Sequence, residues 1–172
     1  MTIRTSLFVG LVTSSLAFAN DGCYHGSGHV PAGKAAPDSI QGVVGVTGTT
    51  FEHHLVLRVR DREVALSATS ADSAALTRLA GVETRIRGRR IGKSTIRVQS
   101  FTALRVDGSP VVDGVIVNDS GRLFLRTSPG LRLLGNPPAK LREMISARVW
   151  VGGPLDRGPN TYGVIVPPVR QP

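Results

Sequence analysis

The sequence predicts an all-β fold in which two small five-stranded barrels follow one another, each with one short helix. Twenty glycines and eleven prolines among 172 residues provide many turns and favour short strands over long helices. From position 41 onward the apolar residues come in short runs that mostly alternate with polar residues, as in half-buried strands. The order of these runs repeats in the second half of the chain, which indicates two copies of one unit.

The first 19 residues have the layout of a signal peptide. Arg4 supplies the positive start, a short apolar run follows, and Ala17-Phe18-Ala19 places small residues where a signal peptidase reads them. The run is about ten residues, whereas a transmembrane helix needs about 20. We therefore expect cleavage after Ala19, a periplasmic or secreted protein, and no transmembrane segment. A buried N-terminal strand is the alternative interpretation.

Residues 20–39 are rich in Gly, Ala, Pro and His and lack apolar periodicity, which is typical of a flexible linker. The single cysteine, Cys23, lies here, so an exported form has no internal disulfide. Lipid attachment at Cys23 is the less favoured localisation, because two of the three preceding residues are polar. Cys23, His25 and His29 are weak candidates for metal ligands, since a flexible segment is poorly preorganised. We expect no cofactor.

The first barrel is predicted over residues 40–108. Within it, a helix is expected at 71–81, where Asp72 would cap the start and Gly81 would take a left-handed stop. The five expected strands are residues 43–46, 55–59, 64–66, 83–88 and 95–101.

The second barrel is predicted over residues 109–168, followed by a tail at 169–172. Asn136 followed by two prolines is typical of a helix start, with the asparagine as the cap. The expected strands are residues 115–117, 123–125, 131–134, 148–151 and 162–166.

The two blocks align residue by residue at a constant offset of 65, which predicts an internal duplication. One added residue in the last turn extends the alignment to the final strand, and Gly42 and Gly114 occupy equivalent starts. The matched pairs are Leu66 with Leu131, Leu76 with Leu141, Leu79 with Met144, Ile86 with Val151, Gly88 with Gly153, Ile96 with Tyr162, and Val98 with Val164.

In residues 79–88 and 144–153 an apolar helix end, a small residue, an alternating strand and a glycine follow one another. With this pattern the chain resembles bacterial OB-fold modules, including small exported ones, over roughly residues 41–106 and 111–168. The resemblance implies Greek-key barrels with a helix at one end, and it brings no catalytic residues. Single-stranded nucleic acid is the partner that such modules suggest.

A basic hairpin is the main candidate site. The formal net charge is +9, or about +8 without the signal peptide, and a basic surface attracts polyanions. Alternate residues of a strand share a face, so Arg85, Arg87 and Arg89 gather opposite the apolar positions. Arg90 and Lys93 are expected in the turn that follows, and Arg97 projects from the next strand. A solvated outer face is the alternative interpretation. The candidate ligand-binding residues are Arg85, Arg87, Arg89, Arg90, Lys93 and Arg97.

The second block offers Arg148 and Trp150, because Val149 and Val151 are expected to face inward and leave these two side chains outside. An outward Trp150 is either a stacking platform for a sugar or base, or a seal for the contact between the two barrels. The favoured interpretation is the seal.

No pattern in the sequence points to an enzyme: nucleophile motifs, phosphate-binding glycine loops and paired carboxylates are all lacking. The sequence therefore predicts a non-enzymatic binding module for an anionic ligand or envelope polymer, contacted through the basic hairpin. One alternative is a structural or assembly protein that contacts another envelope protein through barrel faces and Trp150. The other is single-stranded nucleic-acid binding, which the few aromatic residues and the export signal disfavour.

Overall fold

The computed structural model describes residues 38–49 and 52–169. The predicted signal peptide and the candidate metal ligands Cys23, His25 and His29 lie outside the described residues. The described residues are mostly strand and belong to one compact unit, Ala36–Pro172. Neither described helix has the length and apolar character needed to cross a membrane.

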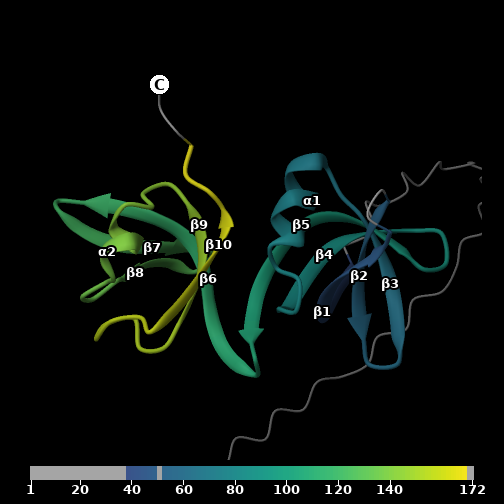
Figure 1. Ribbon diagram of the computed structural model, residues 1–172, viewed down its shortest axis with the longest axis horizontal. Coiled ribbons are helices and arrows are strands. Elements are labelled where there is room, and N and C mark those ends of the chain that lie inside the picture. The colour runs from purple at the N-terminus through teal and green to yellow at the C-terminus, as the bar shows by residue number, and fades with distance from the viewer. Residues whose placement is uncertain (1–37, 50–51, 170–172) are drawn as a thin grey trace, which may run out of the picture. The chain divides into compact units, whose positions relative to one another are not determined.

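Five strands close into a barrel, which we call the N-terminal barrel (Figure 1). They are β1 (Asp38–Gly48), β2 (His53–Val59), β3 (Arg62–Ser67), β4 (Glu83–Ile91) and β5 (Thr95–Val106). β1 pairs antiparallel with both β2 and β4, β2 pairs with β3, and β4 pairs with β5. A parallel pairing of β3 with β5 closes the ring, so this part of the chain has the predicted barrel.

A short helix, α1 (Ser70–Thr77), connects β3 to β4. Its N-cap is Thr69, whose side chain accepts a hydrogen bond from the Asp72 backbone N–H at 3.2 Å. The prediction that Asp72 caps the helix was therefore wrong: its carboxylate accepts a hydrogen bond from the Thr69 hydroxyl and lies in the first turn, where the helix dipole favours a negative charge.

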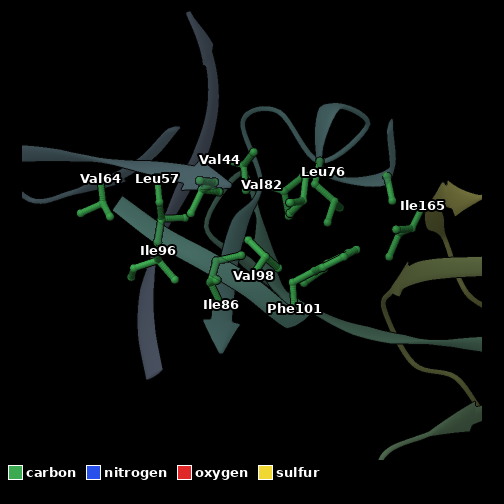
Figure 2. Close-up of a cluster of buried hydrophobic side chains, with 14 residues drawn as sticks. Val44, Leu57, Val64, Leu76, Val82, Ile86, Ile96, Val98, Phe101 and Ile165 are labelled. Atoms are coloured by element: carbon green, nitrogen blue, oxygen red, sulfur yellow. The ribbon is translucent and has the colours of Figure 1, made fainter. Parts of the chain in front are cut away.

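The interior of the N-terminal barrel is filled by one apolar cluster drawn from its five strands and α1, which also includes Ile165 near the C-terminal end of the chain. Figure 2 shows Val44, Leu57, Ile86 and Ile96 gathered in this cluster. Burying one such side chain stabilises a fold by about 1.5–3 kcal/mol. Because these residues must face inward, the strands that carry them present their alternate residues to solvent.

The rest of the chain forms a second set of strands, the C-terminal sheet, in the order β10-β9-β6-β7-β8. No pairing joins β8 to β10 among the described residues, so these strands form an open sheet where the sequence predicts a second closed barrel. The elements are β6 (Ser109–Asp119), β7 (Arg122–Thr127), β8 (Gly130–Leu133), α2 (Ala139–Arg142), β9 (Arg148–Gly152) and β10 (Thr161–Val166).

The start of α2 differs from the prediction. The residue at the N-cap is Pro138, and no side chain caps the helix. Asn136 lies outside it with a φ of 40°, in the left-handed region that asparagine tolerates better than most residues. Asn136 therefore shapes the preceding turn and does not cap the helix.

Backbone hydrogen bonds of β1 recur in β6. Val44 donates to the carbonyl of Val82 at 3.1 Å and accepts from the Gly81 N–H at 2.9 Å. The same two bonds, both at 2.9 Å, join Ile116 to Ala147 and Ser146. Gly81 and Ser146 also share a left-handed backbone, with φ of 85° and 71°. The two halves therefore use the same local geometry where the helix connection meets the first strand.

Gly42 and Gly114 also occupy equivalent positions, as predicted. Gly42 opposes the second residue of β4, and Gly114 opposes the second residue of β9. Each glycine also lies against the backbone carbonyl of an arginine on the strand to its other side. A Cβ on Gly42 would lie 2.3 Å from the Arg58 carbonyl oxygen, and one on Gly114 would lie 2.6 Å from that of Arg126. Only glycine permits this close approach of two strands.

The predicted matches in the last strand were wrong. Tyr162 opposes Val151 as Phe101 opposes Ile86, so this strand is shifted by 61 residues, and Tyr162 matches Phe101 instead of Ile96. The match of Val98 with Val164 fails for the same reason.

The predicted match of Leu66 with Leu131 was also wrong. Leu131 is 55% exposed, whereas its proposed match Leu66 is buried. The strand register gives the reason. Leu57 of β2 opposes Val64 of β3, and Leu125 of β7 opposes Arg132 of β8 in the same way. The offset between β3 and β8 is therefore 68 residues and not 65. The residue in the role of Leu66 is then Leu134, which is buried.

We predict that Gly42→Ala lowers the free energy of unfolding by about 1–3 kcal/mol, because the added methyl group overlaps the Arg58 carbonyl. Denaturant unfolding of the purified protein measures this difference. Ser39→Ala is the control, since Ser39 is exposed on the same strand and should change stability little. Equal stability of the Gly42→Ala variant and the wild type would contradict the close packing described here.

Candidate functional site

The outer face of β4 carries a row of arginines. Arg85, Arg87 and Arg89 are exposed, while the residues between them are buried in the barrel. The alternation predicted from the sequence is thus confirmed for this strand. The core determines it, because Ile86 and its inward neighbours cannot turn outward without exposing apolar surface.

The strands on either side of β4 place uncharged hydrogen-bonding side chains beside these arginines. Directly paired residues of neighbouring strands share a face, with Cβ atoms about 5 Å apart. The neighbours are exposed and come from β1 and β5. They are Gln41 and Thr102 beside Arg85, and Ser39 and Ser100 beside Arg87.

A fourth arginine lies beside this row, on the neighbouring strand β5. Arg97 of β5 lies directly opposite Arg89 and is also exposed. Two like charges in this position destabilise the pairing by about 0.2–1 kcal/mol. We call Arg85, Arg87, Arg89 and Arg97 the arginine strip. Among the described residues, no carboxylate forms an ion pair with any of the four.

Two other predicted members of the basic hairpin are placed differently. Arg90 belongs to β4, not to the turn, and its Nε lies 3.4 Å from a carboxylate oxygen of Asp38. Its charge is therefore partly matched within the barrel. Lys93 lies in the exposed turn between β4 and β5, next to the Arg89–Arg97 end of the strip.

A carboxylate marks the opposite end of the strip. Glu83 shares the outer face of β4 with Arg85, but its side chain accepts a hydrogen bond from Gln41 at 2.6 Å and pairs with Arg105 at 3.2 Å. The Gln41 hydrogen bond, and then the Arg105 guanidinium, hold the pKa of Glu83 below its ordinary value. Glu83 is thus ionised and occupied by partners outside the strip.

Arg148 is not part of this surface. Its guanidinium forms two hydrogen bonds of 2.8 Å with the carboxylate of Asp113, and a third with the carbonyl of Phe101. It also lies 4.4 Å from the centre of the Phe101 ring, and the Asp113 side chain is only 3% exposed. Asp113 accepts a further bond from the Ala103 N–H. Arg148 therefore joins β9, β6 and β5 and has little capacity left for a ligand.

Trp150 is half-buried and packs against the apolar cluster of the N-terminal barrel. A Cβ on Gly163, the residue opposite it on β10, would lie 2.4 Å from the indole Nε1, so one side of the ring is covered by backbone. These contacts favour the interpretation of Trp150 as a seal within the chain over that of a stacking platform.

The described residues contain no group of three or more His, Cys, Asp or Glu side chains arranged to hold a metal ion. His54 is exposed, and its Nε2 lies 3.8 Å from Glu52.

The alternation of residues in the sequence predicted the arginines, but it did not predict the role of Asp113 or the hydroxyl groups that flank the strip. These depend on which strands are neighbours and in what register, which alternation alone does not reveal.

We predict that the stability gained from Glu83 is lost in acid. A carboxylate whose pKa is lowered on folding stabilises the protein above its ordinary pKa of 4.5, and the gain disappears as the pH falls through the folded value. The stability difference between wild type and Glu83→Gln should therefore favour the wild type at neutral pH and shrink below about pH 4.5. Urea unfolding over a pH series measures this difference, and a difference independent of pH would contradict this account.

We also predict that Gln41→Leu raises the pKa of Glu83, because it removes the hydrogen bond to the Glu83 carboxylate. NMR titration of Glu83 in both proteins measures the change.

We also predict that Asp113→Ala lowers the free energy of unfolding by about 2–4 kcal/mol, because it leaves Arg148 and the Ala103 N–H without their acceptor. A double-mutant cycle with Arg148→Ala should show strong coupling. Asp156→Ala is the control, since that exposed carboxylate lies 4.0 Å from Arg157. Additive effects of the two substitutions would show that the pair is not a unit.

Comparisons with known proteins give no relative on which a function could rest: no family model, no curated protein and no solved structure matches this chain.

Proposed function

We propose that this protein is an exported, non-enzymatic binding module whose N-terminal barrel holds a linear polyanion along the arginine strip. The export part of the proposal rests on the signal-peptide layout of residues 1–19. The binding part rests on one observation: three exposed arginines follow one another along β4 without a carboxylate partner among the described residues, and Arg97 directly opposes the last of them, Arg89.

The energetics favour a polymer over a small anion. A single exposed ion pair is worth about 0–1 kcal/mol, so one carboxylate or phosphate on this surface would bind weakly. A polyanion contacts several arginines at once and releases the counterions condensed along it. It also relieves the repulsion between Arg89 and Arg97, whose guanidinium groups then share an anionic partner.

We further propose that the C-terminal sheet derives from a second copy of the same OB-like module. The matching hydrogen bonds of Val44 and Ile116 support this, as do the equivalent glycines, Gly42 and Gly114. The copy does not carry a second strip, because Trp150 stands at the position equivalent to Arg85. The binding surface proposed here is therefore confined to the first module.

A structural role is the second candidate, and the packing of Trp150 against the N-terminal cluster is the observation that bears on it. If Trp150 joins the two halves of one chain, Trp150→Ser weakens that contact without changing the oligomeric state. If it joins separate chains, the same variant dissociates an oligomer. Light scattering on both proteins distinguishes the two cases.

We predict that replacing Arg85, Arg87 and Arg97 by glutamine causes elution from an anionic matrix at clearly lower salt, because it removes three of the four arginines of the strip. The matched control replaces Arg122, Arg126 and Arg132, which are exposed on β7 and β8, and changes the net charge equally. Elution of the two variants at the same salt concentration would show that net charge, and not the strip, causes retention.

A further inference from the structure

We propose that the ligand of the arginine strip is a phosphodiester-linked polymer, recognised through its backbone, with one phosphate at each of the three arginines of β4. This inference rests on the function proposed above and narrows it to one class of polyanion. It follows from the spacing of the arginines, from the groups beside them and from the charge at each end of the strip.

The spacing comes from strand geometry. Arg85, Arg87 and Arg89 occupy alternate positions of β4, and a strand rises by about 3.3 Å per residue. Successive arginines are therefore anchored about 6.6 Å apart along β4, and the β4–β5 register shifts once within the strip, between Arg87 and Gly88. Successive phosphates of an extended phosphodiester chain repeat at a similar distance, so polymer and strip stay in register over several units. The charges of polyuronates and highly sulfated glycans follow other repeats.

The groups beside the strip suit the same chemistry. An arginine fork binds phosphate through two parallel hydrogen bonds, and it remains charged throughout the range in which proteins are folded. A phosphodiester presents two unbridged oxygens, so one can accept from the arginine while the other accepts from a hydroxyl group. Exposed Ser39 and Ser100 flank Arg87, and exposed Thr102 lies beside Arg85.

The two ends of the strip define the length of the footprint. Glu83 lies beyond Arg85, where its ion pair with Arg105 leaves no unpaired arginine for a further phosphate. At the other end Arg97 lies across from Arg89, and the exposed turn with Lys93 follows. The footprint therefore covers three phosphates, the last of them shared by Arg89 and Arg97.

The side chains paired with the strip are hydroxyls, an amide and another arginine, and none of them is aromatic. Proteins that bind single strands through their bases use aromatic side chains as stacking platforms. This surface offers no such platform beside the strip, so it is suited to reading a phosphate backbone, whatever groups that backbone carries. Bases should therefore add little to the affinity.

The first experiment measures binding of the full chain to fluorescent oligomers by anisotropy. The probes are abasic oligodeoxyribonucleotides, oligothymidylates and oligogalacturonates, each with two to ten charges. We expect affinity for the abasic series to rise steeply to three phosphates and only slowly beyond, with a salt slope of about 2 at about 0.7 per phosphate. Abasic and thymidine probes should bind alike, and both should bind at least tenfold more tightly than galacturonates of equal charge.

The second experiment moves one charge without removing it. In the double variant Arg87→Gln/Ser100→Arg, the central cation shifts to the directly opposed position on β5, and net charge is unchanged. Register recognition predicts at least a fivefold loss of affinity for the abasic probe, with no loss for galacturonates. Arg132→Gln, on β8, is the control that lowers net charge away from the strip and should leave affinity within twofold.

The possible outcomes separate the two proposals. Equal binding of abasic and galacturonate probes, abolished by the Arg85/Arg87/Arg97 variant, would overturn the phosphodiester inference and leave a general polyanion site. Unchanged binding in the charge-shifted variant would also overturn it, provided that thermal unfolding shows the variant is folded. Much tighter binding of thymidine probes than of abasic ones would show that bases are read and would overturn backbone recognition. Failure of all probes to bind at low salt would end both proposals.

Discussion

The closing of the N-terminal barrel by the parallel pairing of β3 with β5 is the constraint on which the rest of the structure depends. Once the ring is closed, every strand has one face in the core and one in solvent, and a slip of one residue would bury charge. Glycine at position 42 lets β1 approach β2 closely enough for this ring to form. The arginine strip is a direct consequence, because the burial of Ile86 on β4 requires the exposure of Arg85 and Arg87.

The local arrangement of charge distinguishes the strip from the other arginines of the protein. Arg58, Arg90, Arg105 and Arg148 each have a carboxylate partner within 3.4 Å, so their charges stabilise the fold. Exposed arginines such as Arg122 and Arg132 lack a carboxylate partner as the strip does, but in the strip three arginines follow one another on one strand face and Arg89 directly opposes Arg97. Like charges held together by a rigid scaffold cost some stability, and this arrangement is typical of surfaces that use the same charges to bind a ligand.

The sequence predicted the fold best where burial and alternation agree, as in residues 84–89 of β4, where buried residues and exposed arginines alternate. It failed where local signals were ambiguous. Asp72 and Asn136 are both residue types that often cap helices. The backbone places Thr69 at the N-cap position of α1 and Pro138 at that of α2, where no side chain caps the helix. The role of Arg148 was also missed, since its acceptor Asp113 lies 35 residues away and is brought to it only by the pairing of β6 with β9.

The difference between the two halves has a physical cause in one side chain. Arg132 occupies the register position at which Val64 faces the core of the N-terminal barrel, and it remains exposed. Closing the C-terminal sheet would bury its guanidinium among apolar residues, at a cost that no neighbouring carboxylate offsets in the described chain. A charged side chain on a short edge strand also discourages pairing with another protein's edge. The exposed Arg132 therefore opposes closure of the C-terminal sheet into a second barrel.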